Sequence, residues 1–143
     1  MIVVDASVFA KLFLDELDHD QAEALFSHAL ETELPLVAPS LLLYESLSIG
    51  LRHGVPFEEI TGLLGRLRIA RLEISEPDES ELFLAEHIAT TGNKAAGYPG
   101  LQDSIYHAMA IQRDGLFVTA DARHVAKAGQ FGHVTLLADW KPA

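Results

Sequence analysis

Short runs of apolar residues alternate along this chain with longer stretches in which apolar residues recur every three or four positions. The runs lie at 2–4, 36–38, 116–119 and 134–137. Each is brief and continuous, as expected for strands of a parallel sheet that is covered on both faces. A fifth segment, 69–74, alternates apolar with charged residues and predicts a strand near a sheet edge.

The stretches with three- and four-residue spacing predict helices, and local signals mark several of their ends. Ser7 and Ser40 precede apolar patterns as helix caps do, and Gly54 and Gly115 follow such patterns as helix stops do. The predicted helices span 7–14, 20–32, 40–53, 56–67, 78–91, 101–114 and 123–127. Strands that alternate with helices predict an α/β fold, here a three-layer α/β/α sandwich with a mostly parallel central sheet and helices on both faces.

The length and composition predict a single domain over residues 1–143. The chain has 143 residues, of which 49% are hydrophobic, and this length suits one core. Its first residues, Met-Ile-Val-Val-Asp, lack the basic start and long apolar run of a signal peptide. Prolines, serines and Glu45 interrupt the most apolar stretch, 34–51, so we expect no membrane span and a cytoplasmic protein.

Cysteine is absent and acidic residues are in excess. The lack of cysteine excludes disulfides, thiolate catalysis and metal sites built on sulfur. The chain has 21 acidic residues against 10 lysines and arginines, a formal net charge of -11, which disfavours a large surface that grips phosphates. A nucleic-acid substrate therefore requires that the acids be segregated or neutralised.

Three aspartates are expected at one edge of the sheet. Asp5 ends the first predicted strand, and Asp121 follows the strand at 116–119. Asp103 lies in the first turn of the helix that leads into that strand, and such a helix begins at the edge where parallel strands end. Open α/β sheets bind ligands at this edge. Taken singly, each aspartate is equally well explained as a helix cap or a first-turn acid.

Glu45 is harder to explain by helix formation alone. The residues three and four positions away, which would flank it on a helix, are Leu41, Leu42, Ser48 and Ile49. No lysine or arginine is therefore beside it to form an ion pair. A carboxylate that faces apolar residues is costly unless it is paired, or else its pKa rises. Its helix follows a strand, so Glu45 is expected near the same edge as the aspartates.

Four carboxylates at one edge would repel one another, and the segments around Asp5, Glu45 and Asp121 contain no lysine or arginine. A divalent cation with oxygen ligands would offset this repulsion, and Mg²⁺ or Mn²⁺ suits such ligands. Ser7 and Thr119 each lie two residues from an aspartate. Their hydroxyl groups are candidates to orient the metal ligands.

The same segments resemble the PIN-domain pattern. The matching motifs are Asp5-Ala6-Ser7 after an N-terminal strand, Tyr44-Glu45 on an early helix, Asp103-Ser104-Ile105-Tyr106 on a later helix, and Thr119-Ala120-Asp121 after a strand. Their order and spacing, and the total length, are most similar to the VapC-type toxin ribonucleases of bacterial and archaeal toxin-antitoxin modules. The similarity runs over essentially the whole chain. Ser104 stands where that family often has alanine.

The resemblance implies a metal-dependent endoribonuclease that acts as the toxin of a toxin-antitoxin pair, with Mg²⁺ or Mn²⁺ as its cofactor. It carries over Asp5, Glu45, Asp103 and Asp121 as the catalytic and metal-binding acids, with Asp5 and Asp103 as the expected direct ligands. One or two ions would activate a water for in-line attack on RNA, leaving a 5′-phosphate and a 3′-hydroxyl. The implied partners are the RNA substrate, a VapB-like antitoxin and a second copy of the chain in a homodimer.

Any grip on RNA phosphates has to be local in so acidic a chain. The candidate RNA-contacting residues are Lys11, Lys94, Arg123 and Lys127. His107 lies four residues after Asp103 on the same predicted helix face and is a second kind of candidate. It either reaches the metal or acts as a general acid, or, as we expect, it is a partly exposed structural histidine.

Other functions remain open at this point. A phosphotransferase that uses Asp5 as its nucleophile normally needs a second aspartate two positions later, where this chain has Ser7. Glycine-rich nucleotide-binding motifs are absent. The main alternative is a catalytically silent PIN-like protein-interaction module. Metal-dependent nuclease activity, and its loss on Asp103→Asn, would distinguish the enzyme from the module.

Overall fold

The computed structural model describes residues 1–142, and its core is one five-stranded sheet. The strands are β1 (Ile2–Val4), β2 (Leu36–Ala38), β3 (Leu72–Ile74), β4 (Leu116–Thr119) and β5 (Val134–Leu136). Their order across the sheet is β3-β2-β1-β4-β5, and every neighbouring pair is parallel. The predicted sheet, described as mostly parallel, is therefore parallel throughout.

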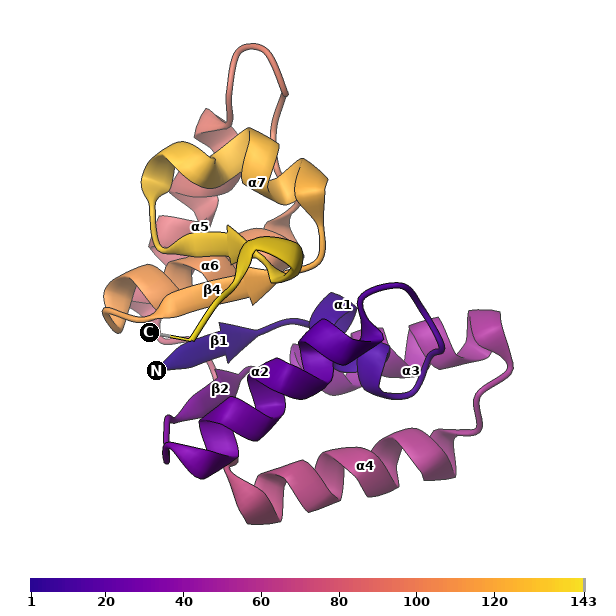
Figure 1. Cartoon of the computed structure of the whole chain (residues 1–143). Helices are drawn as coiled ribbons and strands as arrows, with labels where there is room; N and C mark the ends of the chain where they lie inside the picture. The colour runs from indigo at the N-terminus through magenta and orange to yellow at the C-terminus, as the bar shows by residue number, and fades with distance from the viewer. Residues whose placement is uncertain (143) are drawn as a thin grey trace.

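Helices connect the strands and cover both faces of the sheet, as the sequence predicts (Figure 1). They are α1 (Ala6–Phe9), α2 (His19–Glu31), α3 (Leu41–His53), α4 (Phe57–Ala70), α5 (Glu79–Thr91), α6 (Leu101–Gln112) and α7 (Ala122–Ala128), with 3₁₀ turns at Ala10–Leu12, Gly129–Phe131 and Leu137–Asp139. Among residues 1–142, no helix is both long enough and apolar enough to cross a membrane.

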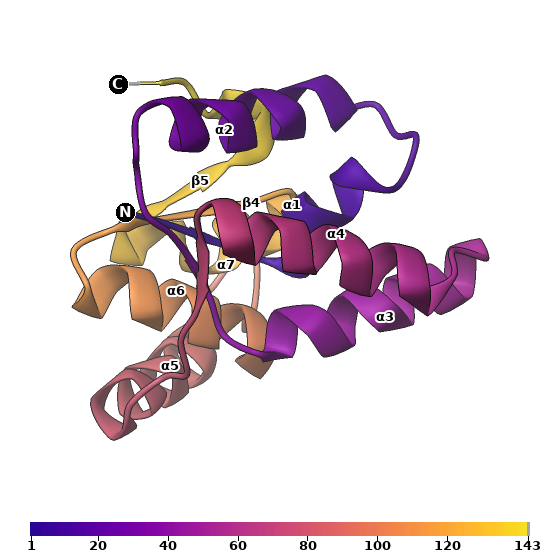
Figure 2. The same cartoon turned by 90° about the horizontal axis from the view of Figure 1, so that it is seen from below.

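The layers are easiest to see from below the molecule (Figure 2). One face of the sheet is covered by α2, and the other by α6, which α5 backs from outside. The α3–α4 pair lies toward the edge of the sheet formed by β3, and α4 packs against that strand. This arrangement is the predicted three-layer α/β/α sandwich.

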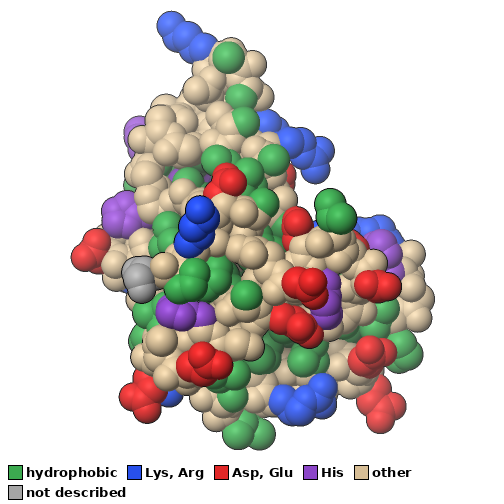
Figure 3. Space-filling view, viewed as in Figure 1, with side chains coloured by type: hydrophobic (Ala, Val, Ile, Leu, Met, Phe, Trp, Pro, Cys, Tyr) green, Lys and Arg blue, Asp and Glu red, His purple; other side chains and the backbone are tan. Residues whose placement is uncertain are grey.

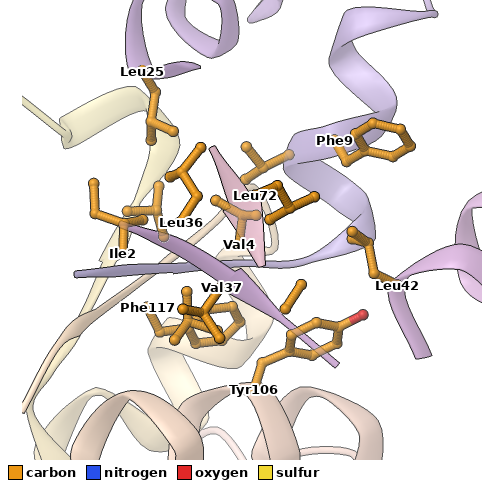
Figure 4. Packing of buried hydrophobic residues seen from close by; sticks show 14 of the residues in the cluster. Ile2, Val4, Phe9, Leu25, Leu36, Val37, Leu42, Leu72, Tyr106 and Phe117 are labelled. Carbon is orange, nitrogen blue, oxygen red and sulfur yellow. The ribbon is translucent and has the colours of Figure 1, made fainter. Parts of the chain in front are cut away.

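The core lies between these layers, on both faces of the inner strands of the sheet. Phe117 of β4 is fully buried, and its ring stacks on that of Tyr106 from α6 with 5.8 Å between ring centroids. Leu25 from α2 approaches the strands from the opposite side (Figure 4). Buried apolar side chains on both faces explain why the strand segments are continuous apolar runs.

The edge strand was predicted too long toward its N-terminus. Helix α4 continues to Ala70, so the first part of the segment 69–74 is helical and β3 begins only at Leu72. Ile69 is 90% exposed on the last turn of α4. The alternation that suggested a strand therefore combines a solvent-facing helix end with a short strand, and two such pieces cannot be separated by periodicity alone.

Two helix starts use different side chains from those predicted. The cap of α1 is Asp5, whose Oδ1 accepts a hydrogen bond from the Val8 backbone N–H at 3.1 Å. Ser7 lies inside this helix. Ser40 precedes α3 as expected, but its side chain makes no capping bond, and its backbone N–H instead donates to Glu76 at 2.6 Å. Local sequence signals located the helix starts, but they did not identify the side chains that accept hydrogen bonds there.

The two predicted glycine stops act in different ways. Gly54 ends α3 with a φ of 70°, the left-handed conformation that glycine adopts without strain. After α6 the positive φ, 54°, belongs to Asp114 instead. Gly115 is needed for space, because a Cβ atom there would lie 2.7 Å from the Met1 side chain and 2.9 Å from the Met1 carbonyl oxygen.

The sheet order places a reversal point of the topology between β1 and β4. The chain runs outward from β1 through β2 to β3, then returns to β4 on the opposite side of β1. In open α/β sheets, ligands bind outside the carboxyl ends of the strands at such a reversal point. Asp5 directly follows β1, and Asp121 lies two residues after the end of β4.

Acidic side chains are unevenly distributed on the surface. On the face shown in Figure 3 they gather over the connection between α1 and α2, whereas the lysine and arginine side chains stand apart from one another. That connection and the start of α2 contain Asp15, Glu16, Asp18 and Asp20. Part of the acidic excess is thus gathered on one connection of the chain.

Candidate active site

The four predicted carboxylates line one cavity at the reversal point of the sheet. It has a volume of about 350 Å³. The residues that line it are Asp5, Ala6, Ser7, Glu45, Ser48, Ile49, Arg52, Asp103 and Asp121. Four chain segments that are far apart in sequence therefore bring one acid each to the same hollow.

Asp5 is the most buried of the four acids and the most firmly held. Its side chain is 3% exposed. The Ser7 hydroxyl donates to its Oδ1 at 2.6 Å, and the Thr119 hydroxyl donates to its Oδ2 at 2.6 Å. Both hydroxyl oxygens also accept backbone N–H bonds, from Ala120 to Ser7 and from Asp121 to Thr119. The carboxylate is thus fixed by hydroxyl groups that join the ends of β1 and β4.

Burial has a larger effect on Asp5 than these hydrogen bonds do. It raises the pKa of Asp5 to about 6, although the bonds from Ser7, Thr119 and Val8 lower it. The negative charge of Glu45 raises the pKa slightly further. A carboxylate in this position gains from a nearby cation, because it has lost most of its contact with water.

Asp103 and Asp121 come from the starts of two helices. Asp103 is in the first turn of α6, and Asp121 caps α7 by accepting a bond from the Arg123 backbone N–H at 2.9 Å. Burial, followed by the charges of Asp5 and Asp121, raises the pKa of Asp103 to about 6. These carboxylates therefore interact electrostatically across one site.

Glu45 is held by a tyrosine on α6. The Tyr106 hydroxyl donates to Glu45 Oε1 at 2.6 Å, and the Tyr106 ring is buried against the sheet with its hydroxyl on the side of α3 (Figure 4). Burial raises the pKa of Glu45, while this hydrogen bond lowers it and the charge of Asp103 raises it. The sequence carries a signal for this contact, since Tyr106 lies three residues after Asp103 on one helix face.

Arg52 is a residue of the cavity that the sequence reasoning missed. It lies on α3 seven residues after Glu45, which is two helical turns, so both side chains project from the same side of the helix. Counting two turns from Glu45 would have identified it. Arg52 is the only lysine or arginine among the described residues that line this cavity.

The four predicted RNA-contacting cations have different surroundings. Lys11 forms an ion pair with Glu16, and Arg123 lies with its Nε 3.6 Å from Asp121 Oδ1. A second hollow lies next to the cavity. Neither Lys94 nor Lys127 is among the described residues that line the cavity or this second hollow.

His107 does not reach the carboxylates, and the expectation that it is partly exposed is wrong. It is fully buried beside Phe117. Its Nε2 donates to the Gly132 carbonyl oxygen, 2.6 Å away, and its Nδ1 lies 2.9 Å from Nε2 of His124, so Nδ1 accepts from that ring. Burial lowers the pKa of both rings, that of His124 to about 4. The pair is a neutral part of the core between α6 and α7.

A compact group of possible metal ligands lies elsewhere, at the start of α2. His19, Asp20 and Glu23 are the only three histidine, aspartate or glutamate side chains in the described chain whose ligand atoms lie within 4.8 Å of one another. An ion pair between His19 and Glu23, 3.0 Å apart, accounts for their closeness. No three of the cavity carboxylates come so close, which is consistent with their mutual repulsion.

The raised pKa values predict a specific dependence of stability on pH. The folded-state pKa of Asp103 lies near 6, above the ordinary value of 3.8, so the native protein holds a proton that the unfolded chain releases. The contribution of the protonated Asp103 side chain to stability is complete below pH 4 and is lost as the pH rises through 6. Without metal, Asp103→Asn should therefore raise the free energy of unfolding at pH 8 by roughly 1–3 kcal/mol.

The measurement is thermal unfolding in EDTA, with the native protein and the variant compared at each pH. The comparison is needed because His107 and His124, with lowered pKa values, change stability in the opposite direction over the same range. The variant should melt several degrees higher at pH 8, and the two proteins should converge below pH 4. An equal difference at both pH values would contradict the shared electrostatic site.

Comparison with known proteins gives a consistent result for the fold. The sequence matches the family model described as PIN domain over residues 2–130. No curated protein sequence matches this chain significantly. The solved structures of similar fold include two that are each 17% identical in sequence to this chain. At this identity they show a shared fold and nothing more.

The first is the crystal structure of PAE2754 from Pyrobaculum aerophilum, with a TM-score of 0.64 over 96% of this chain and 90% of that one. The second is the crystal structure of VapBC2 from Rickettsia felis bound to a DNA fragment from their promoter. Its TM-score is 0.68 over 95% of this chain and 97% of that one. The fold thus extends over nearly the full length of both structures.

Proposed function

This chain belongs to the PIN-domain family, and we propose that it is a divalent-metal-dependent endoribonuclease whose active site is the carboxylate cavity. The observation that carries the proposal is the convergence of Asp5, Glu45, Asp103 and Asp121 on one hollow with a single arginine. Such a concentration of negative charge is unfavourable by itself. It is favourable when a cation is part of the working site.

The residues of the cavity fit Mg²⁺ or Mn²⁺. The charged donors are carboxylate oxygens, and the described residues that line the cavity include no histidine or cysteine. Hard divalent ions prefer this donor set. Asp5 and Asp103 would hold the ion directly, and Glu45 and Asp121 would hold it through water or bind a second ion. When bound, the metal supplies an activated water and stabilises the charge on the leaving oxygen.

The protein side chains do the positioning. Ser7 and Thr119 keep both oxygens of Asp5 in fixed places, and Tyr106 does the same for one oxygen of Glu45. Ligands held in this way need little rearrangement when substrate binds, which favours the reaction. Water attack in line with the leaving oxygen would give a 5′-phosphate and a 3′-hydroxyl.

We further propose that the nuclease is the toxin of a toxin-antitoxin pair and acts in the cytoplasm. The similar structure from Rickettsia felis is described as a VapBC pair bound to DNA from its promoter. A VapB-like antitoxin with a basic segment would suit a chain with a net charge of -11 and would cover the carboxylate cavity. Exposed Tyr44 and Phe57, which are 63% and 45% accessible, are candidate contacts in a homodimer.

The proposal is tested by metal dependence. The purified protein, free of any partner, should cleave single-stranded RNA with Mg²⁺ or Mn²⁺ and not in EDTA. Mn²⁺ at a hundred times its dissociation constant should stabilise the fold by about 2.7 kcal/mol in thermal melts. Cleavage products should carry 5′-phosphate groups, which end-labelling detects.

A matched pair of variants locates the metal. Asp103→Asn should abolish the Mn²⁺-induced rise in melting temperature, whereas Asp20→Asn, in the exposed group on α2, should retain it. The opposite result would place the ion on α2 and remove the main support for the proposal. RNA that stays intact at every metal concentration would favour the interaction module.

A further inference from the structure

A second hollow adjoins the carboxylate cavity and has a different charge. It has a volume of about 440 Å³ and shares Ser7, Ile49, Arg52 and Asp121 with the cavity as a common wall. We call it the flanking hollow. Its charged lining residues are Lys11, Glu16, Arg52, Asp121 and Arg123. Any strand that lies across the cavity in this direction must enter the flanking hollow next.

The balance of charge reverses between the two hollows. The cavity has four carboxylates and one arginine, whereas the flanking hollow has three cations, on three separate segments, against two carboxylates. The whole chain has 21 acids for 10 lysines and arginines. An excess of cations over carboxylates beside the carboxylate cavity is the reverse of this overall balance.

Arg52 is the cation that best fits a ligand in this position. It lines both hollows and, within residues 1–142, forms no hydrogen bond or ion pair, whereas Lys11 is paired with Glu16 and Arg123 lies close to Asp121. A cation in the last turn of α3 is also favoured by the helix dipole, so its presence there is not informative by itself. The informative observation is that Arg52 lies on the wall that the two hollows share.

We propose that the flanking hollow binds an RNA backbone phosphate next to the scissile one, with Arg52 as its principal contact. This inference rests on the proposed function. A phosphate that is to be cleaved has to lie among four carboxylates, so the binding energy for the strand must come from beside them. The planar guanidinium group of arginine matches two phosphate oxygens at once. Lys11 and Arg123 would supply longer-range attraction, whereas Lys94 and Lys127 lie outside this path.

The test compares two arginines. In an Asp103→Asn background, which keeps the RNA intact, binding of a fluorescein-labelled single-stranded RNA is followed by anisotropy in Mg²⁺ at several salt concentrations. Arg52→Gln should weaken binding about tenfold and reduce the slope of log K against log salt by about 0.7, the value for one phosphate contact. Arg68→Gln, on the exposed side of α4, removes the same charge and should change affinity less than about twofold.

Kinetics of the otherwise native chain give a second readout. Arg52→Gln should raise KM about tenfold and leave kcat nearly unchanged, because the contact is made equally in the ground and transition states. Equal affinities of the Arg52→Gln and Arg68→Gln proteins would overturn the inference, even if native RNA cleavage is normal. Conversely, a selective loss of RNA binding in Arg52→Gln would support it even if the native chain cleaves nothing, which would count only against the proposed function.

Discussion

Replacing Asp103 with asparagine is expected to reduce RNA cleavage by about a thousandfold or more while the chain remains folded. The side chain lines the cavity with Asp5 and Asp121, and its raised pKa reflects both their charges and its burial. Asparagine keeps the shape but removes the charge that would hold a cation. Of the four acids, Asp103 is the cleanest choice, because Asp5 and Asp121 also cap helices.

The measurement is single-turnover cleavage of an end-labelled RNA with enzyme in excess and saturating Mg²⁺. Asp20→Asn is the control, since it removes one negative charge from an exposed position outside the cavity and should keep activity within about twofold. The metal-free variant should also unfold at a higher temperature than the native protein at pH 8, so a loss of cleavage cannot be attributed to misfolding. Activity of the Asp103→Asn protein within tenfold of native would exclude a shared carboxylate site.

The fold was largely predictable because the buried strands and helices have distinct periods. The runs at 36–38 and 116–119 coincide with β2 and β4, since strands buried on both faces leave no polar position within them. The predicted element boundaries were wrong where one segment combines parts of two elements. The region 69–74 joins a solvent-facing helix end to an edge strand, and near Gly115 the close approach of Met1 decides which residue is tolerated.

The convergence of the four acids could be predicted because parallel topology alone brings strand ends and helix starts to one edge. The partners of those acids could not, because periodicity gives the face of an element but not the direction of each side chain. Tyr106 was noted only as part of a family motif, yet its hydroxyl orients Glu45. His107 was judged from its own helix, but its burial depends on His124, which lies seventeen residues later in the chain.

Arg113→Ala is expected to cause the largest loss of stability, about 3–5 kcal/mol. Arg113, just after α6, donates to both oxygens of Glu81 at 2.7 and 3.0 Å, and also to the Ser75 hydroxyl and the Glu76 carbonyl oxygen. Glu81 is only 2% exposed. Its remaining hydrogen bond in the described chain comes from the Asp78 backbone N–H in the capping box of α5.

Without Arg113 the buried carboxylate would have one donor and no counter-charge, which is far less favourable than removing an exposed ion pair. Urea denaturation should show a lower midpoint with an unchanged slope. Arg68→Ala, an exposed arginine on α4, should change the free energy of unfolding by less than about 0.5 kcal/mol. A loss below about 1 kcal/mol in Arg113→Ala would mean that water reaches Glu81 once the arginine is gone.

The double variant Glu81→Gln/Arg113→Ala separates two causes of this loss. If the unpaired charge is the main cause, the double variant should be more stable than Arg113→Ala alone, because glutamine keeps the bond to the Asp78 N–H without a buried charge. If the two are equally stable, the loss comes from the bonds of Arg113 to Ser75 and Glu76. Those bonds join the end of α6 to the segment after β3, at the opposite end of α6 from Asp103. In both cases the metal-dependent stabilisation of the folded fraction should persist, because none of these residues lines the carboxylate cavity.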